Sequence, residues 1–247
     1  MIIYWRPCEI EETLSFVPRW NNKPKLEILK KCWLALNEQV DKDDTIIVIS
    51  DKLSFETQDW LVRAAKGFVQ WVYVEDEEGK STNRREYPIH YITLVEEMDK
   101  QTKAYPNEIH YLCNDDILHL PHALNTLKSI YKDGWQGFAT LYDYPDRYTL
   151  DKQYTATTRS CEIYLGSGSH WRTIPSCTGV TSALGSTWQK YMRELKRNAF
   201  FNDDSYTWMA YAQVGCLSPI PGCATHLTEN HMTPRVNWEQ YYDSINI

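Results

Sequence analysis

Two pairs of adjacent aspartates are the residues of this chain whose types and spacing are best suited to chemistry. Asp115 and Asp116 follow the apolar run EIHYLCN, and Asp203 and Asp204 precede the segment SYTWMAYAQV. Neighbouring carboxylates repel each other, and the repulsion grows as water is removed, so such a pair needs open solvent or a cation. A hard divalent cation shared with phosphate groups is one such partner. Asp115 and Asp116 therefore form a candidate Mg²⁺ or Mn²⁺ site.

Each pair also has a structural interpretation, because Asp and Asn cap helix starts and interact well with the helix dipole. The helix-start signal after the first pair is Pro121, five residues beyond Asp116, so capping there would require a much earlier helix start. The second pair is followed directly by a helical pattern over 205–214. A carboxylate at a helix start can instead be a general base that removes a proton from an incoming hydroxyl. Position alone leaves both interpretations open.

Two further candidates are a late histidine and a pair of arginines. His226 ends the apolar run CLSPIPGCATH and is the favoured imidazole for a metal, although a lone histidine is more commonly structural. The spacing HLTENH carries no zinc-protease signature. Arg84 and Arg85 follow a Gly/Ser/Thr/Asn loop before a helical pattern, which suits contact with phosphate or base. A solvated pair of charges explains the two arginines equally well.

The composition limits the class of protein. The chain has 247 residues, 43% hydrophobic and 24% charged, which are globular values. A net charge of -7 without a basic block argues against a nucleic-acid partner. No run is long enough for a transmembrane segment, and early charges argue against a secretory leader. Seven cysteines without a C-x-x-C pair are typical of reduced thiols. We therefore expect a soluble, cytoplasmic protein.

Short apolar runs alternate with helical patterns over the first 133 residues. Strands are expected over 2–6, 45–50, 69–76 and 108–113, with helices between them. This alternation predicts an α/β fold with a mostly parallel central sheet flanked by helices. Beyond residue 134 strands and helices are mixed, and 169–185 is expected to be irregular. We expect a single domain over 1–247, whose halves 1–133 and 134–247 share one sheet.

In such sheets ligands bind beyond the carboxyl ends of the strands. Asp51, the loop 80–85 and residues 114–116 all fall at these ends. The chain has no G-x-x-x-x-G-K-[ST], no G-x-G-x-x-G and no G-x-S-x-G. These absences exclude the P-loop NTPase, Rossmann dehydrogenase and α/β-hydrolase classes.

The motifs, taken in this order, resemble the GT-A glycosyltransferases, especially the family-2-like inverting type. TIIVISD looks like the family's second strand, which ends in an aspartate near the nucleotide base, and STNRR falls where a loop lines the nucleotide. YLCNDD looks like the strand that carries the D-x-D metal motif, and NDDSYTW resembles the E-D motif with the catalytic base. GCATH lies where a late histidine joins the metal. The first acid of D-x-D is missing here, and Asp-Asp replaces Glu-Asp.

The resemblance implies a GT-A-like fold with a Rossmann-like nucleotide half, 1–133, and a mixed acceptor half, 134–247. It implies a hexosyl- or pentosyltransferase of glycan biosynthesis that moves a sugar from a nucleotide-diphosphate sugar to a hydroxyl of a glycan or other acceptor, with inversion and with Mn²⁺ or Mg²⁺. The implied site residues are Asp116 and His226 for the metal, Asp51, Arg84, Arg85 and Asp115 for the donor, and Asp204, or alternatively Asp203, as the base. Aromatic residues of the second half are expected to stack on acceptor sugars: Trp171, Trp188, Tyr206 and Trp208.

Two other classes remain open at this stage. A nucleotidyltransferase would use a similar sheet edge, but it should show a Gly-rich, basic loop after its first strand, and RPCEIEE is neither. A carbohydrate-binding protein without catalysis would explain the aromatic residues and need no metal. Hydrolysis of a nucleotide sugar in the presence of Mn²⁺ would separate the enzyme from the binding protein.

Overall fold

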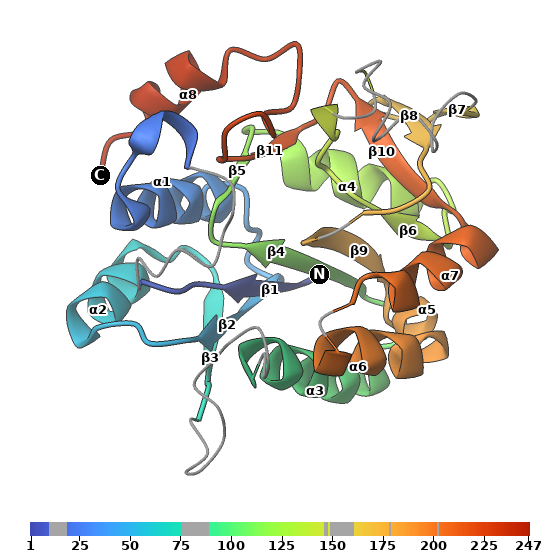
Figure 1. Ribbon diagram of the computed structural model, residues 1–247, viewed down its shortest axis with the longest axis horizontal. Helices are drawn as coiled ribbons and strands as arrows, with labels where there is room; N and C mark the ends of the chain where they lie inside the picture. The colour runs from blue at the N-terminus through green and yellow to red at the C-terminus, as the bar shows by residue number, and fades with distance from the viewer. Residues whose placement is uncertain (10–18, 76–88, 146–147, 149–160, 178, 202) are drawn as a thin grey trace.

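The computed structural model describes the chain except for residues 10–18, 76–88, 146–147, 149–160, 178 and 202. A nine-stranded sheet runs through it in the order β3-β2-β1-β4-β9-β6-β10-β8-β7 (Figure 1). The first four strands in this order are parallel to one another. β9 then pairs antiparallel with both β4 and β6. β10 pairs parallel with β6, and β8 pairs antiparallel with both β10 and β7. The expected α/β fold, a central sheet flanked by helices, is confirmed, and the sheet is mixed, with most of its parallel pairing in the first half.

Four of the five strands of the first half coincide with the expected apolar runs, and the short strand β5 was not expected. The five strands are β1 (Ile2–Arg6), β2 (Thr45–Ser50), β3 (Phe68–Tyr73), β4 (Ile109–Asn114) and β5 (Ile117–His119). In β1, Ile3 and Trp5 belong to the core on one face of the sheet, while Ile2 and Tyr4 belong to the core on the other. This alternation follows from the two-residue period of a strand. Both faces of the parallel part are therefore covered, as its apolar runs predict.

The helices cover the two faces of this sheet (Figure 1). One face carries α1 (Lys25–Asn37), α2 (Phe55–Ala64) and α4 (Ala123–Lys132). The other carries α3 (Ile89–Ala104), α5 (Gly185–Lys190), α6 (Met192–Phe201) and α7 (Ser205–Val214). A short 3₁₀ turn η1 (Trp20–Asn22) precedes α1, and α8 (Trp238–Ser244) packs on α1. The parallel strands therefore end between two helical layers.

The second half differs from expectation in one important strand. The segment 169–185, expected to be irregular, contains β8 (His170–Thr173) and β9 (Val180–Leu184). β9 lies in the middle of the sheet although its sequence, VTSAL, is rich in small polar residues. Its polar groups are satisfied internally, since Ser182 Oγ donates to the Ala139 carbonyl at 2.8 Å and Thr181 Oγ1 donates to Cys177 Sγ at 3.2 Å. β9 can be buried because its hydroxyl groups form hydrogen bonds inside the protein, although its side chains are not strongly hydrophobic.

The remaining strands join distant parts of the chain. They are β6 (Phe138–Ala139), β7 (Ile163–Leu165), β10 (Cys216–Ile220) and β11 (Ala224–His226). β11 pairs antiparallel with β5, with His226 opposite Ile117. The nine-stranded sheet itself contains strands from both halves, so the expected shared sheet is confirmed. No helix in the described part of the chain is long and apolar enough to cross a membrane.

Candidate active site

The carboxyl ends of β1, β2 and β4 meet at one edge of the sheet. Arg6 at the end of β1 pairs with Asn114 at the end of β4, and Arg6 Nη2 donates to Asn114 Oδ1 at 2.9 Å. Cys8, two residues beyond β1, forms a parallel bridge with Asp51, the residue after β2. The backbone N–H of Cys8 also donates to Asp115 Oδ2 at 2.8 Å. Asp51 and Asp115 are thus gathered around Cys8 at the expected edge.

A glycine shapes this edge. Gly179, just before β9, has φ +73°, and a Cβ placed on it would come within 3.0 Å of Asn114 Nδ2. Left-handed backbone favours glycine because it has no Cβ. The chain can therefore pass close to the end of β4 at this point without displacing Asn114.

Asp115 is neutralised by a cation from the chain itself. Lys25, the first residue of α1, places Nζ 2.6 Å from Asp115 Oδ1, and the two side chains are only 12% and 7% exposed. A lysine in the first turn opposes the helix dipole, so its position is understandable only through this partner. Burial favours the neutral amine, but Asp115 outweighs it and raises the pKa of Lys25. Lys25 is a site residue that the sequence did not reveal, because its partner lies 90 residues away.

Asp116 has a different partner. His226 Nε2 lies 2.9 Å from Asp116 Oδ2, and the backbone N–H of Leu227 donates to the Asp116 carbonyl at 2.9 Å. The pairing of β5 with β11 creates this contact between residues 110 positions apart. The structure therefore places Asp116 and His226, the two residues expected to bind the metal, in direct contact. The helix-cap alternative for Asp116 fails, because β5 follows it and α4 begins only at Ala123.

The two carboxylates differ in their protonation. Burial raises the pKa of Asp115 despite Lys25. Burial also disfavours ionisation of Asp116, but His226 outweighs it and holds the pKa of Asp116 well below its ordinary value. In return, Asp116 raises the pKa of His226 against the effect of burial. Asp116 is thus the better placed of the two to act as an anionic ligand.

The donor set fits a divalent cation that is shared with a substrate. Asp116 Oδ1 is buried and has no hydrogen-bond partner. A carboxylate oxygen beside an imidazole suits Mn²⁺, whose other positions can be filled by phosphate oxygens and water. Within the described residues no group of three or more His, Cys, Asp and Glu side chains could hold a metal. A metal bound here would therefore need further oxygen ligands from the substrate. Asp115 is already paired with Lys25, so we do not expect it to bind the metal directly.

The two residues of the second acidic pair have different roles: Asp203 caps α7 with its side chain, and Asp204 does not. Asp203 Oδ1 accepts a hydrogen bond from the Ser205 backbone N–H at 2.9 Å, and this bond lowers the pKa of Asp203. The structural interpretation therefore holds for Asp203. Asp204 makes no capping bond with its side chain. Its Oδ1 instead accepts from Asn198 Nδ2 at 3.0 Å, which orients the carboxylate from α6.

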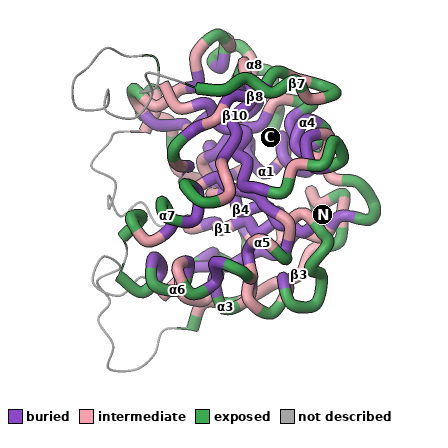
Figure 2. The backbone as a smooth tube through the Cα atoms, turned by 90° about the vertical axis from the view of Figure 1, so that its right-hand side faces the viewer, coloured by how far each residue is buried: buried purple, intermediate pink, exposed green. Residues whose placement is uncertain are grey.

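Asp204 is linked to the sheet edge through α3. Burial raises the pKa of Tyr91, in the first turn of α3, and the nearby charge of Asp204 raises it further. The guanidinium of Arg6 lies 5.5 Å from the Tyr91 ring centre. Tyr91 thus lies near Arg6 at the end of β1 and is close enough to Asp204 to be affected by its charge. Figure 2 shows α6 and α7 on the side of the molecule toward which β1 runs from the N-terminus.

A second polar cluster adjoins the Asp116–His226 pair. The rings of Tyr142 and His226 are 6.4 Å apart, and Tyr142 bridges to Ala224. The next residue, Asp143, is buried and forms an ion pair with Arg172 of β8. The sequence did not mark this pair, since an Asp and an Arg 29 residues apart carry no pattern. This buried ion pair therefore lies one residue beyond Tyr142, whose ring is near that of His226.

The structure corrects the expectation for two tryptophans. Trp171 is fully buried in the core shared with β1, and Trp188 is 2% exposed. Trp188 Nε1 donates to the His110 carbonyl at 3.2 Å, and its ring lies 5.0 Å from that of Phe138. Neither ring has a face available for a sugar, so the expected acceptor stacking is wrong for both. Trp208 of α7 is 53% exposed and has such a face.

Arg84 and Arg85, with the rest of their loop, lie outside the described residues, so their expected donor contacts stay a prediction. Asp51 is buried at the edge, and His90 Nδ1 of α3 lies 4.0 Å from its Oδ2. The structure therefore brings together Asp51, Asp115, Asp116 and His226.

No protein-family profile and no curated protein matches the sequence. Three similar solved structures are as follows. An active-site mutant of the galactosyltransferase LgtC is 14% identical, with a TM-score of 0.46, over 88% of this chain and 72% of that one. A putative glucose-1-phosphate thymidylyltransferase from Bacillus anthracis is 12% identical, with a TM-score of 0.49, over 100% and 96%. A CMP:2-keto-3-deoxy-manno-octonic acid synthetase is 14% identical, with a TM-score of 0.46, over 90% and 91%. Sequence identities and TM-scores as low as these do not identify the reaction of this chain.

Proposed function

We propose that this chain is a glycosyltransferase that moves a sugar from a nucleotide-diphosphate sugar to a hydroxyl acceptor, with inversion at the anomeric carbon. The observation that carries the proposal is the Asp116–His226 pair at the carboxyl edge of a parallel sheet, with one buried carboxylate oxygen left without a hydrogen bond. A pair of this kind suits a cation that also binds a diphosphate. Asp51, one strand away, would face the nucleoside part of the donor.

In this proposal each residue has a separate role. Asp116 and His226 would hold Mn²⁺ or Mg²⁺, which when bound supplies positive charge to the leaving diphosphate. Lys25 keeps Asp115 paired, so the acidic motif does not repel the phosphates with two uncompensated charges. Asp204 would accept the proton of the acceptor hydroxyl as its oxygen attacks the anomeric carbon and the nucleoside diphosphate leaves. Asp203 is less suited to the role of base, because its carboxylate caps the backbone N–H of Ser205 and this bond lowers its pKa.

Hydrolysis and transfer from a panel of nucleotide-diphosphate sugars, with Mn²⁺, Mg²⁺ or EDTA, test the proposal. We expect slow release of nucleoside diphosphate from one donor class and faster release with a suitable acceptor. Release of pyrophosphate from a nucleoside triphosphate and a sugar phosphate would instead identify a nucleotidyltransferase. Sugar binding without turnover of any donor would identify a carbohydrate-binding protein.

A further inference from the structure

The exposed face of α6 combines basic and aromatic side chains. Arg193, Arg197, Phe200 and Phe201 follow one another at i, i+4, i+7 and i+8, so they fall on one side of the helix. Phe200 and Phe201 are 58% and 59% exposed. The opposite side of α6 is buried in the core through Met192, Leu195 and Ala199, so the core does not account for the two phenylalanines.

The aromatic part of this face continues onto α7. The Phe201 and Tyr206 rings are stacked at 5.6 Å, and the Phe200 and Phe201 rings are 5.0 Å apart. Met209, one turn beyond Tyr206 on α7, is 63% exposed. Exposed apolar side chains that gather in this way mark an interaction surface, unlike single exposed residues. We call Arg193, Arg197, Phe200, Phe201, Tyr206 and Met209 the α6–α7 patch.

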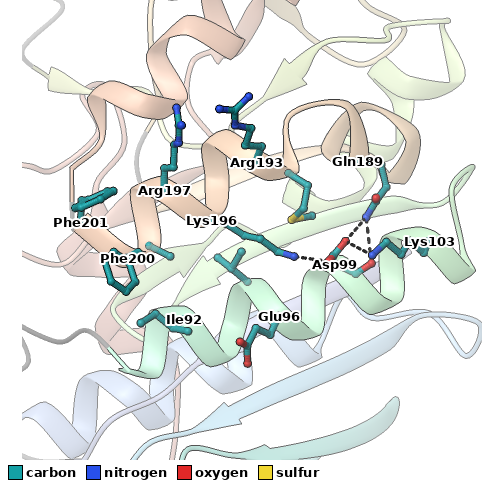
Figure 3. Close-up of a pocket in the computed structure, with 13 residues that line it drawn as sticks. Ile92, Glu96, Asp99, Lys103, Gln189, Arg193, Lys196, Arg197, Phe200 and Phe201 are labelled. Carbon is teal, nitrogen blue, oxygen red and sulfur yellow. Dashed lines mark hydrogen bonds and ion pairs between the residues drawn. The ribbon is translucent and has the colours of Figure 1, made fainter. Parts of the chain in front are cut away.

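A cavity of about 660 Å³ lies beside the patch, between α3 and α6 (Figure 3). Its apolar lining includes Ile92, Val95, Met192 and Ala199, and the two phenylalanines also border it. The cavity is therefore an apolar space that opens next to exposed aromatic rings.

Basic side chains outnumber acidic ones along this cavity, with Lys103, Arg193, Lys196 and Arg197 against Glu96 and Asp99. Lys196 reaches from α6 to Asp99 on α3 with a 2.6 Å ion pair, and Lys103 pairs with the same carboxylate at 2.9 Å (Figure 3). Asp99 is thereby neutralised twice. Arg193 and Arg197 extend from α6 away from α3 (Figure 3), and neither has a carboxylate partner among the described residues. The whole chain carries a net charge of -7, so this basic face is a local exception.

We propose that the α6–α7 patch docks on the surface of a membrane that contains anionic lipids. Arginines at the headgroup level with phenylalanines inserted below them are the arrangement by which amphipathic helices bind such surfaces. A nucleic acid would match the charge but would not explain the apolar cavity. The docking does not depend on the proposed transfer reaction. If both hold, Asp204 at the start of α7 would act close to the lipid surface.

Flotation of the wild-type protein with vesicles tests the proposal without any sugar substrate. We expect binding to phosphatidylglycerol/phosphatidylcholine vesicles, little binding to phosphatidylcholine alone, and weaker binding as salt is raised. Phe200→Ser with Phe201→Ser should reduce the bound fraction roughly tenfold or more. Each of Arg193→Gln and Arg197→Gln should reduce it by roughly fivefold. These side chains are exposed, so circular dichroism should show an unchanged fold.

The matched controls lie on α2, on the other face of the sheet. Phe55→Ser removes the most exposed phenylalanine of the described residues, at 85%, and Arg63→Gln removes an arginine whose side chain is 71% exposed. Neither should change vesicle binding. Equal binding to both vesicle types, or equal loss in the α2 variants, would overturn the proposal. It would also be overturned by self-association or RNA binding that needs Phe200 and Phe201 while vesicles are not bound.

Discussion

At the scale of single residues, each member of the Asn114-Asp115-Asp116 motif has its own partner. Arg6 binds the asparagine, Lys25 pairs with the first aspartate, and His226 with the second. Two adjacent carboxylates are therefore stable at this edge because they face two different cationic groups. The two acids also differ in the oxygens they leave available, since Asp116 keeps a buried oxygen without a hydrogen bond.

Asp116→Ala should abolish the metal-dependent part of donor binding. It removes the carboxylate that has an oxygen free of hydrogen bonds, so Mn²⁺-stimulated binding of a nucleoside diphosphate should weaken by roughly tenfold or more. Titration calorimetry with and without Mn²⁺ measures this. His226→Ala should behave alike. If both variants bind Mn²⁺ and nucleotide as the wild type does, the metal assignment is wrong.

Lys25→Met should act on stability instead. It leaves Asp115 buried without its cation, and breaking a buried ion pair costs about 3 kcal/mol of the free energy of unfolding. The double variant Lys25→Met/Asp115→Asn should lose less than the sum of its two single variants. Urea unfolding measures these differences. Arg63→Met, which breaks an exposed pair with Asp59, is the control and should cost about 0.5 kcal/mol or less. An equal cost in both lysine and arginine variants would contradict the account of the buried pair.

At the scale of elements, two connections shape the site: the α6–α7 junction and the segment that enters β9. The junction presents Asp203 as a cap and Asp204 as a carboxylate held by Asn198. The segment before β9 passes Gly179 against Asn114. The backbone of these two connections therefore determines where the side chains of Asp204 and Asn114 lie.

Asp204→Asn should lower turnover by roughly a hundredfold or more, because it removes the proposed base. The dissociation constant for the donor should stay nearly constant, since the base faces the acceptor. Asp203→Asn is the matched control, because asparagine caps helices as well as aspartate does. Steady-state kinetics and product stereochemistry measure the outcome. Unchanged turnover in Asp204→Asn, or a product with retained configuration, would refute this assignment.

Gly179→Ala tests the passage beside Asn114. Gly134→Ala is the matched control, because Gly134 has φ +97° but no atom within 4 Å of an added Cβ. Both variants should lose about 1 kcal/mol of the free energy of unfolding through strained backbone. Only Gly179→Ala should also weaken nucleotide binding, because its Cβ would displace the Asn114 amide. Equal nucleotide binding by the two variants would mean that this contact does not support the site.

At the scale of the whole molecule, buried polar groups limit the pH range of stability. His119 of β5 is fully buried, and its Nε2 lies 2.7 Å from the Tyr111 hydroxyl. Burial lowers the pKa of His119 to about 4. The unfolded chain, with an ordinary histidine pKa of about 6.5, binds the proton more readily. Stability is therefore fully present above about pH 6.5 and is lost as the pH falls toward 4.

His119→Gln should flatten this dependence. Glutamine can still bond to Tyr111 but takes up no proton, so the variant should lose less stability than the wild type between pH 7 and pH 4. The difference should approach about 3 kcal/mol at the acid end. Urea unfolding at several pH values measures it. Parallel curves for the two proteins would show that His119 does not control acid stability.

The first half of the fold was largely predictable because β1 to β4 are mostly apolar runs, whereas the three-residue strand β5 was not expected. TIIVIS and IIYWR are buried on both faces, so hydrophobicity alone identifies them, and Pro24 correctly indicates the start of α1. The carboxyl-edge placement of Asp51, Asp115 and Asp116 follows from the same alternation of strands and helices. β9 and β8 escaped prediction because their polar side chains are satisfied by distant partners.

What the sequence by itself determined is therefore local: the apolar runs, the helix starts, and the order of acidic motifs along the chain. What only the tertiary structure decided is how residues far apart pair: Lys25 with Asp115, His226 with Asp116, and Asp143 with Arg172. It also decided that Trp171 and Trp188 belong to the core. The physical reason is that burial and ion pairing depend on which elements pack together. The type of a side chain does not determine which residues will be its neighbours.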